Sequence, residues 1–141
     1  MASPFYRILL VEDEPSISQT IWEMLKDSQD CKFQMVRAES VEAGLPKLAS
    51  EIDALLLNIE GPEGSGLASV PTIHAQFSSL PIIVLIPQGM ETLGKQALAA
   101  GAAEYLVKET LSPRSLQRVL QYARERERDG CVMHEETRTS N

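Results

Sequence analysis

The stretch LPIIVLI, residues 80–86, decides the fold, because it is apolar throughout. A strand with one exposed face alternates apolar and polar residues, whereas a strand that is covered on both faces does not. The uninterrupted run therefore predicts a strand inside a parallel sheet, with helices packed on both faces of that sheet.

Similar segments alternate with helical patterns along the rest of the chain. Four more β-rich segments are predicted as strands, at residues 5–11, 32–38, 53–58 and 103–108. Apolar residues at helical spacing predict helices within residues 12–27, 40–51, 67–78, 90–101 and 112–130. Five strands that alternate with five helices through short loops indicate a doubly wound α/β fold with right-handed crossovers.

The ends of several helices carry suitable residues. Ser40 and Ser112 are predicted N-caps, Pro113 suits the first helical position, and Gly101 suits a C-cap. Pro71 is compatible with a helix over 67–78 only within its first turn, because proline has no N–H to donate. These signals predict where the helices begin and end.

One domain and a tail account for the length of the chain. The 141 residues, 43% of them hydrophobic, suffice for a domain with its own core, which we assign to residues 1–128. Residues 129–141 have neither periodicity nor enough apolar residues to pack, so we expect a mobile tail. The charged run RERERDG before it suits a solvated helix end or the lead-in to an output domain.

Composition excludes several classes of function. Thirteen basic and twenty acidic residues give a net charge of −7, which disfavours nucleic acid and anionic lipid as partners. The longest apolar run, residues 81–87, is too short to span a bilayer, and the N-terminus lacks a signal-peptide pattern, so we expect a cytoplasmic protein. Cys31 and Cys131 have no spacing typical of a zinc site.

Polar residues stand where the predicted strands end. Glu12 and Asp13 follow the first strand, Asn58 ends the third, and Lys108 ends the fifth. In a doubly wound sheet, ligands gather at this edge. Two adjacent carboxylates need Mg²⁺ or the Lys108 ammonium to neutralise them; alternatively, the acids are solvated and favour the start of the next helix.

Four motifs, in this order, resemble the receiver domain of two-component response regulators. They are ILLVEDEP, DALLLNIEGPEGSGL, PIIVLI and GAAEYLVK, the last followed by a helix that starts with proline. The resemblance covers roughly residues 5–126. It implies the CheY-like, flavodoxin-like fold, a five-stranded parallel sheet in the order 2-1-3-4-5 with five helices.

The resemblance also implies roles for individual residues. Asn58 lies where the family has the aspartate that a histidine kinase phosphorylates, and Glu12 and Asp13 match the acid pair that holds Mg²⁺. Glu60 lies at the position whose backbone carbonyl helps to bind the metal. Ile86 takes the place of the switch threonine or serine, and Pro87 that of a small residue whose N–H contacts the phosphoryl group. Tyr105 matches the aromatic residue that changes rotamer on activation, and Lys108 matches the lysine that pairs with the phosphoryl group.

Three of these positions depart from the family pattern together. The carboxamide of Asn58 cannot act as the nucleophile that forms an acyl phosphate. Ile86 has no hydroxyl, and Pro87 has no N–H to donate. This conjunction favours a natural pseudo-receiver over an engineered Asp-to-Asn change in an ordinary receiver. Glu109 departs as well, because many receivers have a cis proline there, and it predicts a different path after Lys108.

The acid pair leaves metal binding open. It is either a structural remnant, with Lys108 neutralising Asp13, or part of a weak Mg²⁺ site made by Glu12, Asp13, the amide oxygen of Asn58 and the carbonyl of Glu60. Because one carboxylate of the family site is missing, we expect any Mg²⁺ affinity to be low and no cofactor to be required.

We therefore expect a signalling module and not an enzyme. It would act without phosphorylation, through the face made by the predicted helix at 90–101, the strand at 103–108 and the helix at 112–130. Ile86 would hold Tyr105 in one rotamer. The expected partners are a sensor histidine kinase, a response regulator, another signalling protein or a second copy. The alternative is a phosphoacceptor that uses Asp13; a nucleotide binder would need a glycine-rich loop after the first strand.

Overall fold

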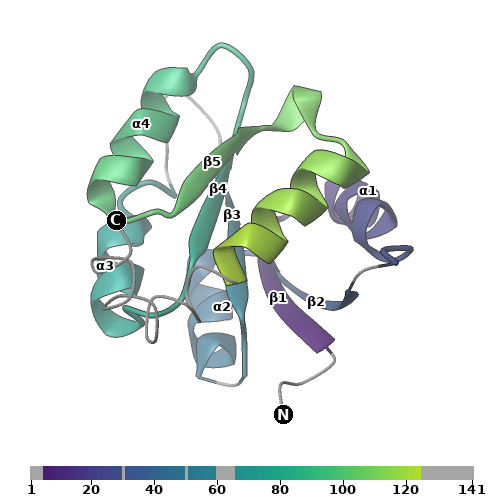
Figure 1. The fold of residues 1–141 in the computed structure, drawn as a ribbon. Coiled ribbons are helices and arrows are strands. Elements are labelled where there is room, and N and C mark those ends of the chain that lie inside the picture. The colour runs from purple at the N-terminus through teal and green to yellow at the C-terminus, as the bar shows by residue number, and fades with distance from the viewer. Residues whose placement is uncertain (1–4, 30, 50, 60–65, 125–141) are drawn as a thin grey trace, which may run out of the picture.

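The computed structural model describes residues 5–29, 31–49, 51–59 and 66–124. Its centre is a sheet of five parallel strands in the order β2-β1-β3-β4-β5 (Figure 1). The strands are β1 (Phe5–Val11), β2 (Lys32–Ala38), β3 (Ala54–Asn58), β4 (Ile82–Ile86) and β5 (Glu104–Val107). The predicted doubly wound sheet and its strand order are confirmed.

The apolar run at residues 80–86 forms β4, between β3 and β5. All five residues of β4 are fully buried. Alternate residues point to opposite faces of the sheet, so Ile82, Val84 and Ile86 belong to one apolar cluster, and Ile83 and Leu85 belong to the other. The absence of alternation in the sequence thus has the predicted cause, which is helices on both faces.

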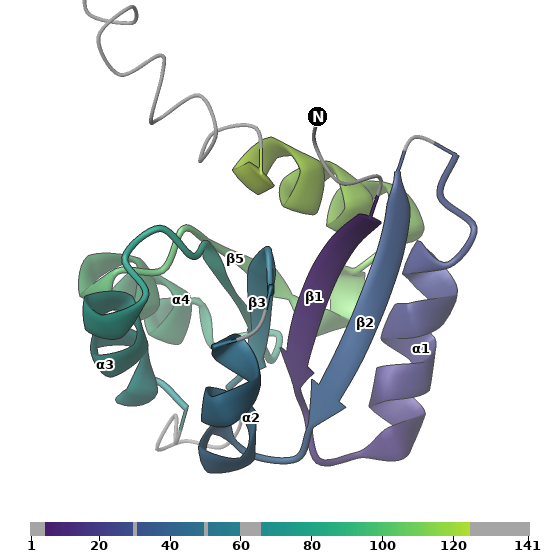
Figure 2. The ribbon, with the colours of Figure 1, turned by 90° about the horizontal axis from the view of Figure 1, so that it is seen from below.

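Five helices cover the two faces within the described residues. The first face carries α1 (Pro15–Leu25) and the C-terminal helix (residues 113–124), which pack through Ile21, Leu25, Leu116 and Leu120. The second face carries α2 (Val41–Leu48), α3 (Ser69–Gln76) and α4 (Glu91–Ala100). Figure 2 shows the sheet between these two layers.

The predicted helix ends are confirmed in their capping contacts. The backbone N–H of Ala43 donates to Ser40 Oγ at 3.1 Å. At the C-terminal helix, Ser112 and Ser115 each accept from the backbone N–H of the other, both at 3.1 Å. Gly101 ends α4 with a backbone φ of 126°, which residues other than glycine rarely adopt.

Two helices are shorter than predicted. α2 ends at Leu48 and contains Pro46, which cannot donate a helical hydrogen bond. α3 begins at Ser69, so Pro71 lies in its first turn as predicted, and it ends because Phe77 leaves the helical conformation. The predicted tail at 129–141 lies outside the described residues. No helix among the described residues has the length and apolar character needed to cross a membrane.

The end of the C-terminal helix is attached to β1. Tyr6 is fully buried, and its hydroxyl donates a hydrogen bond to the carbonyl of Leu120. The guanidinium of Arg124 lies 4.9 Å from the centre of the Tyr6 ring, and Phe33 stacks on the same ring at 5.3 Å. Burial raises the pKa of Tyr6 well above its ordinary range, so the phenol stays neutral and keeps donating.

Candidate functional site at the carboxyl edge of the sheet

The register of β1 and β3 brings Glu12 and Asn58 together. Val11 pairs with Leu57, so the next residue on each strand lies at the same level. Nδ2 of Asn58 donates a hydrogen bond to Oε1 of Glu12. Glu12 is 2% exposed, although it is charged, and such burial requires partners for its carboxylate. The structure thus joins two residues that the sequence predicted to share this edge.

The second oxygen of the Glu12 carboxylate is also engaged. The backbone N–H of Glu14 donates to Oε2 at 3.0 Å, which ties the carboxylate to the turn before α1. The backbone N–H of Glu12 donates to the carbonyl of Ala38 at 2.9 Å, which extends the pairing of β1 with β2. Glu12 is therefore fixed through both its side chain and its backbone.

Arg37 holds the same loop from another side, and sequence analysis missed it. Its Nε donates to the carbonyl of Glu12 at 2.9 Å, and its Nη2 donates to the carbonyl of Asp13 at 3.0 Å. A planar guanidinium can bridge two acceptors in this way, whereas an ammonium cannot do so in a fixed geometry. The only signal in the sequence is the position of Arg37, one residue before the end of a predicted strand.

An acidic hollow of about 470 Å³ opens beside these residues. Asn58 and four carboxylates line it, those of Glu12, Asp13, Glu39 and Glu42. No described lining residue is a lysine or arginine. Asp13 is exposed, so its charge is solvated, while Glu12 is buried. Glu39 and Glu42, which sequence analysis also missed, come from the β2–α2 connection and the first turn of α2.

The donor set does not fit Mg²⁺ as it is arranged. Both oxygens of Glu12 accept hydrogen bonds, and one of them faces the NH₂ of Asn58, which is a donor and not a ligand. Across the described residues, no three His, Cys, Asp or Glu side chains gather in a way that could hold a metal ion. Glu60, the fourth predicted ligand, lies outside the described residues. Weak Mg²⁺ binding stays a prediction.

The edge at β4 is apolar. Ile86 is fully buried in the cluster under α2, α3 and α4, and it pairs with Val107 in the register of β4 and β5. Pro87 follows and is half-buried. This part of the edge offers neither a side-chain hydroxyl nor, at Pro87, a backbone N–H to an anion.

Tyr105 packs against the backbone of α4 at Gly94. A Cβ added to Gly94 would lie 2.5–2.7 Å from three atoms of the Tyr105 ring, which is closer than real Cβ contacts. Tyr105 is half-buried and packs against the same apolar cluster as Ile86. The ring therefore occupies the space that the missing side chain of Gly94 leaves free, a contact that sequence analysis did not predict.

Lys108 lies at the end of β5, where it begins a 3₁₀ turn (Lys108–Thr110). It lines a second hollow of about 250 Å³, between this turn and α1, with Glu109, Leu111 and Ile17 among its neighbours. Asp13 lines the acidic hollow instead. The pairing of Lys108 with Asp13 stays a prediction.

Known proteins resemble this chain in sequence and in fold. The family model of the response regulator receiver domain matches residues 8–121. The response regulator protein FleR of Pseudomonas aeruginosa is 30% identical over 105 residues, which are 72% of this chain and 21% of FleR. The KDP operon transcriptional regulatory protein KdpE of Escherichia coli is 31% identical over 102 residues, 72% of this chain and 44% of KdpE.

A solved structure agrees with the sequence relatives. The signal receiver domain of an HD domain-containing protein from Pseudomonas fluorescens superposes with a TM-score of 0.79 at 24% identity, over 94% of this chain and 96% of that one. At this identity the likeness shows the fold alone. This chain spans about a fifth of FleR and less than half of KdpE. By sequence and fold, the chain belongs to the response regulator receiver domain family of two-component systems.

Proposed function

We propose that this receiver domain signals without being phosphorylated, through contacts with other proteins. The observation that carries the proposal is the contact between Asn58 and Glu12. At the position of the family's phosphoacceptor, the side chain is an amide that donates a hydrogen bond to a buried carboxylate. A carboxamide does not supply the charged oxygen that attacks phosphorus in the formation of an acyl phosphate.

The edge at β4 supports the same proposal. A phosphoryl group requires hydrogen-bond donors around its oxygens. Ile86 is fully buried among apolar side chains and has no side-chain donor, and Pro87 has no backbone N–H to donate. A receiver that has lost the nucleophile and these two donors has lost separate parts of one chemical function.

The proposed interaction face is made by α4, β5 and the C-terminal helix. Figure 1 shows β5 between these two helices. Each helix exposes a large apolar side chain, with Leu98 of α4 39% exposed and Tyr122 of the C-terminal helix 60% exposed. We propose that the chain acts in the cytoplasm and that its partner on this face is a sensor histidine kinase, a response regulator, another signalling protein or a second copy.

Incubation with acetyl phosphate and Mg²⁺, followed by intact-mass measurement, tests the proposal. We expect no gain of a phosphoryl group by the natural chain, because Asn58 is not a nucleophile. The matched variants are Asn58→Asp alone and Asn58→Asp combined with Ile86→Thr and Pro87→Ala. We expect a larger fraction of the combined variant than of Asn58→Asp alone to be phosphorylated, since the combined variant also regains the two missing donors.

A stoichiometric phosphoryl adduct on the natural chain would overturn the proposal. Peptide fragmentation would then identify the acceptor, and Asp13, which is exposed in the acidic hollow, is the residue to inspect first. Full phosphorylation of Asn58→Asp alone would show that Ile86 and Pro87 are compatible with the chemistry. That result would favour an ordinary receiver that carries a single substitution.

A further inference from the structure

A carboxylate from the β5 end of the sheet holds the loop that leaves β4. The backbone N–H of Gln88 donates to Oε1 of Glu109 at 2.7 Å, a length typical of a charge-assisted hydrogen bond. The register of the sheet explains the contact. Ile86 of β4 pairs with Val107 of β5. Gln88 lies two residues after Ile86, and Glu109 lies two residues after Val107.

The loop held by Glu109 leads directly into α4. The N–H of Met90 donates to the carbonyl of Pro87 at 3.1 Å, and the N–H of Leu93 donates to the carbonyl of Met90 at 2.9 Å. Gly89 has φ 87°, which allows the tight turn between them. Because the connection from Gln88 to Glu91 is short and hydrogen-bonded, a shift of Gln88 should also shift the start of α4.

A second contact attaches α4 to β5 further along the helix. The ring of Tyr105 packs against α4 at Gly94, one turn after the helix begins. The Glu109 contact holds the loop that leads into α4, and the Tyr105 contact holds the helix itself. Both α4 and β5 are elements of the face to which we assign partner binding.

We propose that Glu109 is a positioning residue, whose carboxylate holds the β4–α4 loop and through it keeps α4 in one position against β5. The hydrogen bond to Gln88 does this without any added phosphoryl group. The inference deepens the proposed function. The hydrogen bond and its effect on α4 do not depend on that function, but the role of a fixed α4 in partner binding rests on it.

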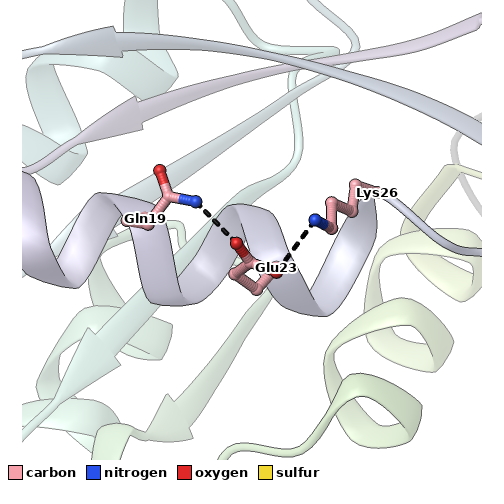
Figure 3. Close-up of polar contacts among 3 residues, drawn as sticks. All are labelled: Gln19, Glu23 and Lys26. Carbon is pink, nitrogen blue, oxygen red and sulfur yellow. Dashed lines mark hydrogen bonds and ion pairs between the residues drawn. The ribbon is translucent and has the colours of Figure 1, made fainter.

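A surface carboxylate on α1 provides the comparison (Figure 3). Glu23 accepts from Nε2 of Gln19 at 2.7 Å and pairs with Nζ of Lys26 at 3.0 Å, both on its own helix. The hydrogen bond with Lys26 lowers the pKa of Glu23. Such pairs within one helix position no other element. Glu109 differs because its partner is the backbone of a separate loop.

The test uses the full chain, with Glu109→Ala and Glu109→Gln as variants and Glu23→Gln as the matched control. Amide hydrogen exchange of Gln88 is the first measurement, and relaxation dispersion of residues 87–95 is the second. In Glu109→Ala we expect exchange at Gln88 to be faster by about threefold to tenfold, as for the loss of one exposed charged acceptor. We expect exchange broadening in the first turns of α4 as well.

Glu109→Gln keeps an acceptor oxygen of the same shape, so we expect it to restore part of the protection, and Glu23→Gln should leave Gln88 unchanged. Equal exchange at Gln88 in the natural chain and Glu109→Ala would overturn the inference. In the natural chain, a scalar coupling across the hydrogen bond between the Gln88 nitrogen and the Glu109 carboxyl carbon tests the contact without any variant. Its absence would also count against the inference, whereas phosphorylation by acetyl phosphate would contradict only the proposed function.

Discussion

The two halves of the carboxyl edge are built in opposite ways. At β1 and β3, polar groups dominate: Glu12 is buried, Asn58 donates to it, and Arg37 binds the backbone of the same loop. At β4 and β5, packing dominates, because Ile86 is fully buried and Tyr105 lies against Gly94. Under the proposed function, each half lacks one part of phosphoryl chemistry, and the physical reason differs between the halves.

The comparison shows where each half is sensitive. In the polar half, the arrangement depends on which atoms donate and which accept, so a change of charge should disturb it more than a change of size. In the apolar half, the arrangement depends on volume, so one added carbon atom should disturb it. A change of charge at Asn58 and a change of volume at Gly94 therefore test the two halves separately.

The largest effect is expected from Asn58→Asp. The change replaces the donor to Glu12 with a second carboxylate, so two negative charges meet at a buried position. We expect the free energy of unfolding in urea at neutral pH to fall by about 3 kcal/mol. Added Mg²⁺ would restore part of this loss, because a divalent cation would offset the repulsion between the two carboxylates. Asn58→Ala is the control, since it removes the donor without adding a charge.

A loss of similar size in Asn58→Ala and Asn58→Asp would contradict this account. It would mean that the hydrogen bond to Glu12, and not the repulsion between carboxylates, accounts for the whole effect. An unfolding midpoint that does not respond to Mg²⁺ in Asn58→Asp would point in the same direction.

Gly94→Ala tests the apolar half. The new methyl group would meet the Tyr105 ring at 2.5–2.7 Å, so the ring or the helix must move. We expect a loss of about 2 kcal/mol in the free energy of unfolding, the usual result of overpacking reduced by the better helix propensity of alanine. The Tyr105 ring resonances should shift in the same variant.

Gly44→Ala is the matched control, because Gly44 is also a buried glycine inside a helix. Its added Cβ would lie 3.2 Å from Leu9 Cδ2 and 3.3 Å from Ala38 Cβ, which small movements can accommodate. We expect Gly44→Ala to cost less than Gly94→Ala. The reverse order would show that the Tyr105 ring moves aside easily and does not fix α4.

The sequence could predict the sheet because its signals are local. The apolar run at residues 80–86 and the caps at Ser40, Ser112 and Gly101 act within a few residues of where they stand. The edge position of Glu12 and Asn58 followed from the same reasoning, since parallel strands end at one side of the sheet.

The missed contacts are those that depend on three-dimensional register. Arg37 reaches carbonyl oxygens more than twenty positions earlier in the chain. Glu109, just after β5, reaches the backbone of Gln88, just after the neighbouring strand β4. In each contact the partner of the side chain is a backbone atom, so no residue type marks that partner in the sequence. Sequence analysis could note Glu109 as a departure from the family pattern, but the departure did not indicate what it binds.

The smallest effect is expected from Arg37→Gln, which removes the bridge to the carbonyls of Glu12 and Asp13. We expect a loss of about 1 kcal/mol, because these hydrogen bonds lie partly in water. Amide exchange at residues 12–14 should become faster, and the side-chain amide resonances of Asn58 should shift. Arg37→Lys should behave similarly, since lysine keeps the charge but cannot bridge two acceptors in a fixed geometry.

Arg7→Gln is the control for this last variant. Nε of Arg7 donates to Oε1 of Gln34 at 3.0 Å, so it also joins β1 to β2, but at the opposite end of the strands. It should change stability without altering exchange at residues 12–14 or the Asn58 amide. If Arg37→Gln left the Asn58 amide unchanged too, the Glu12 contact alone would hold the polar half. The buried charge of Glu12 alone, without the hydrogen bonds of Arg37, would then distinguish the polar half from the apolar half.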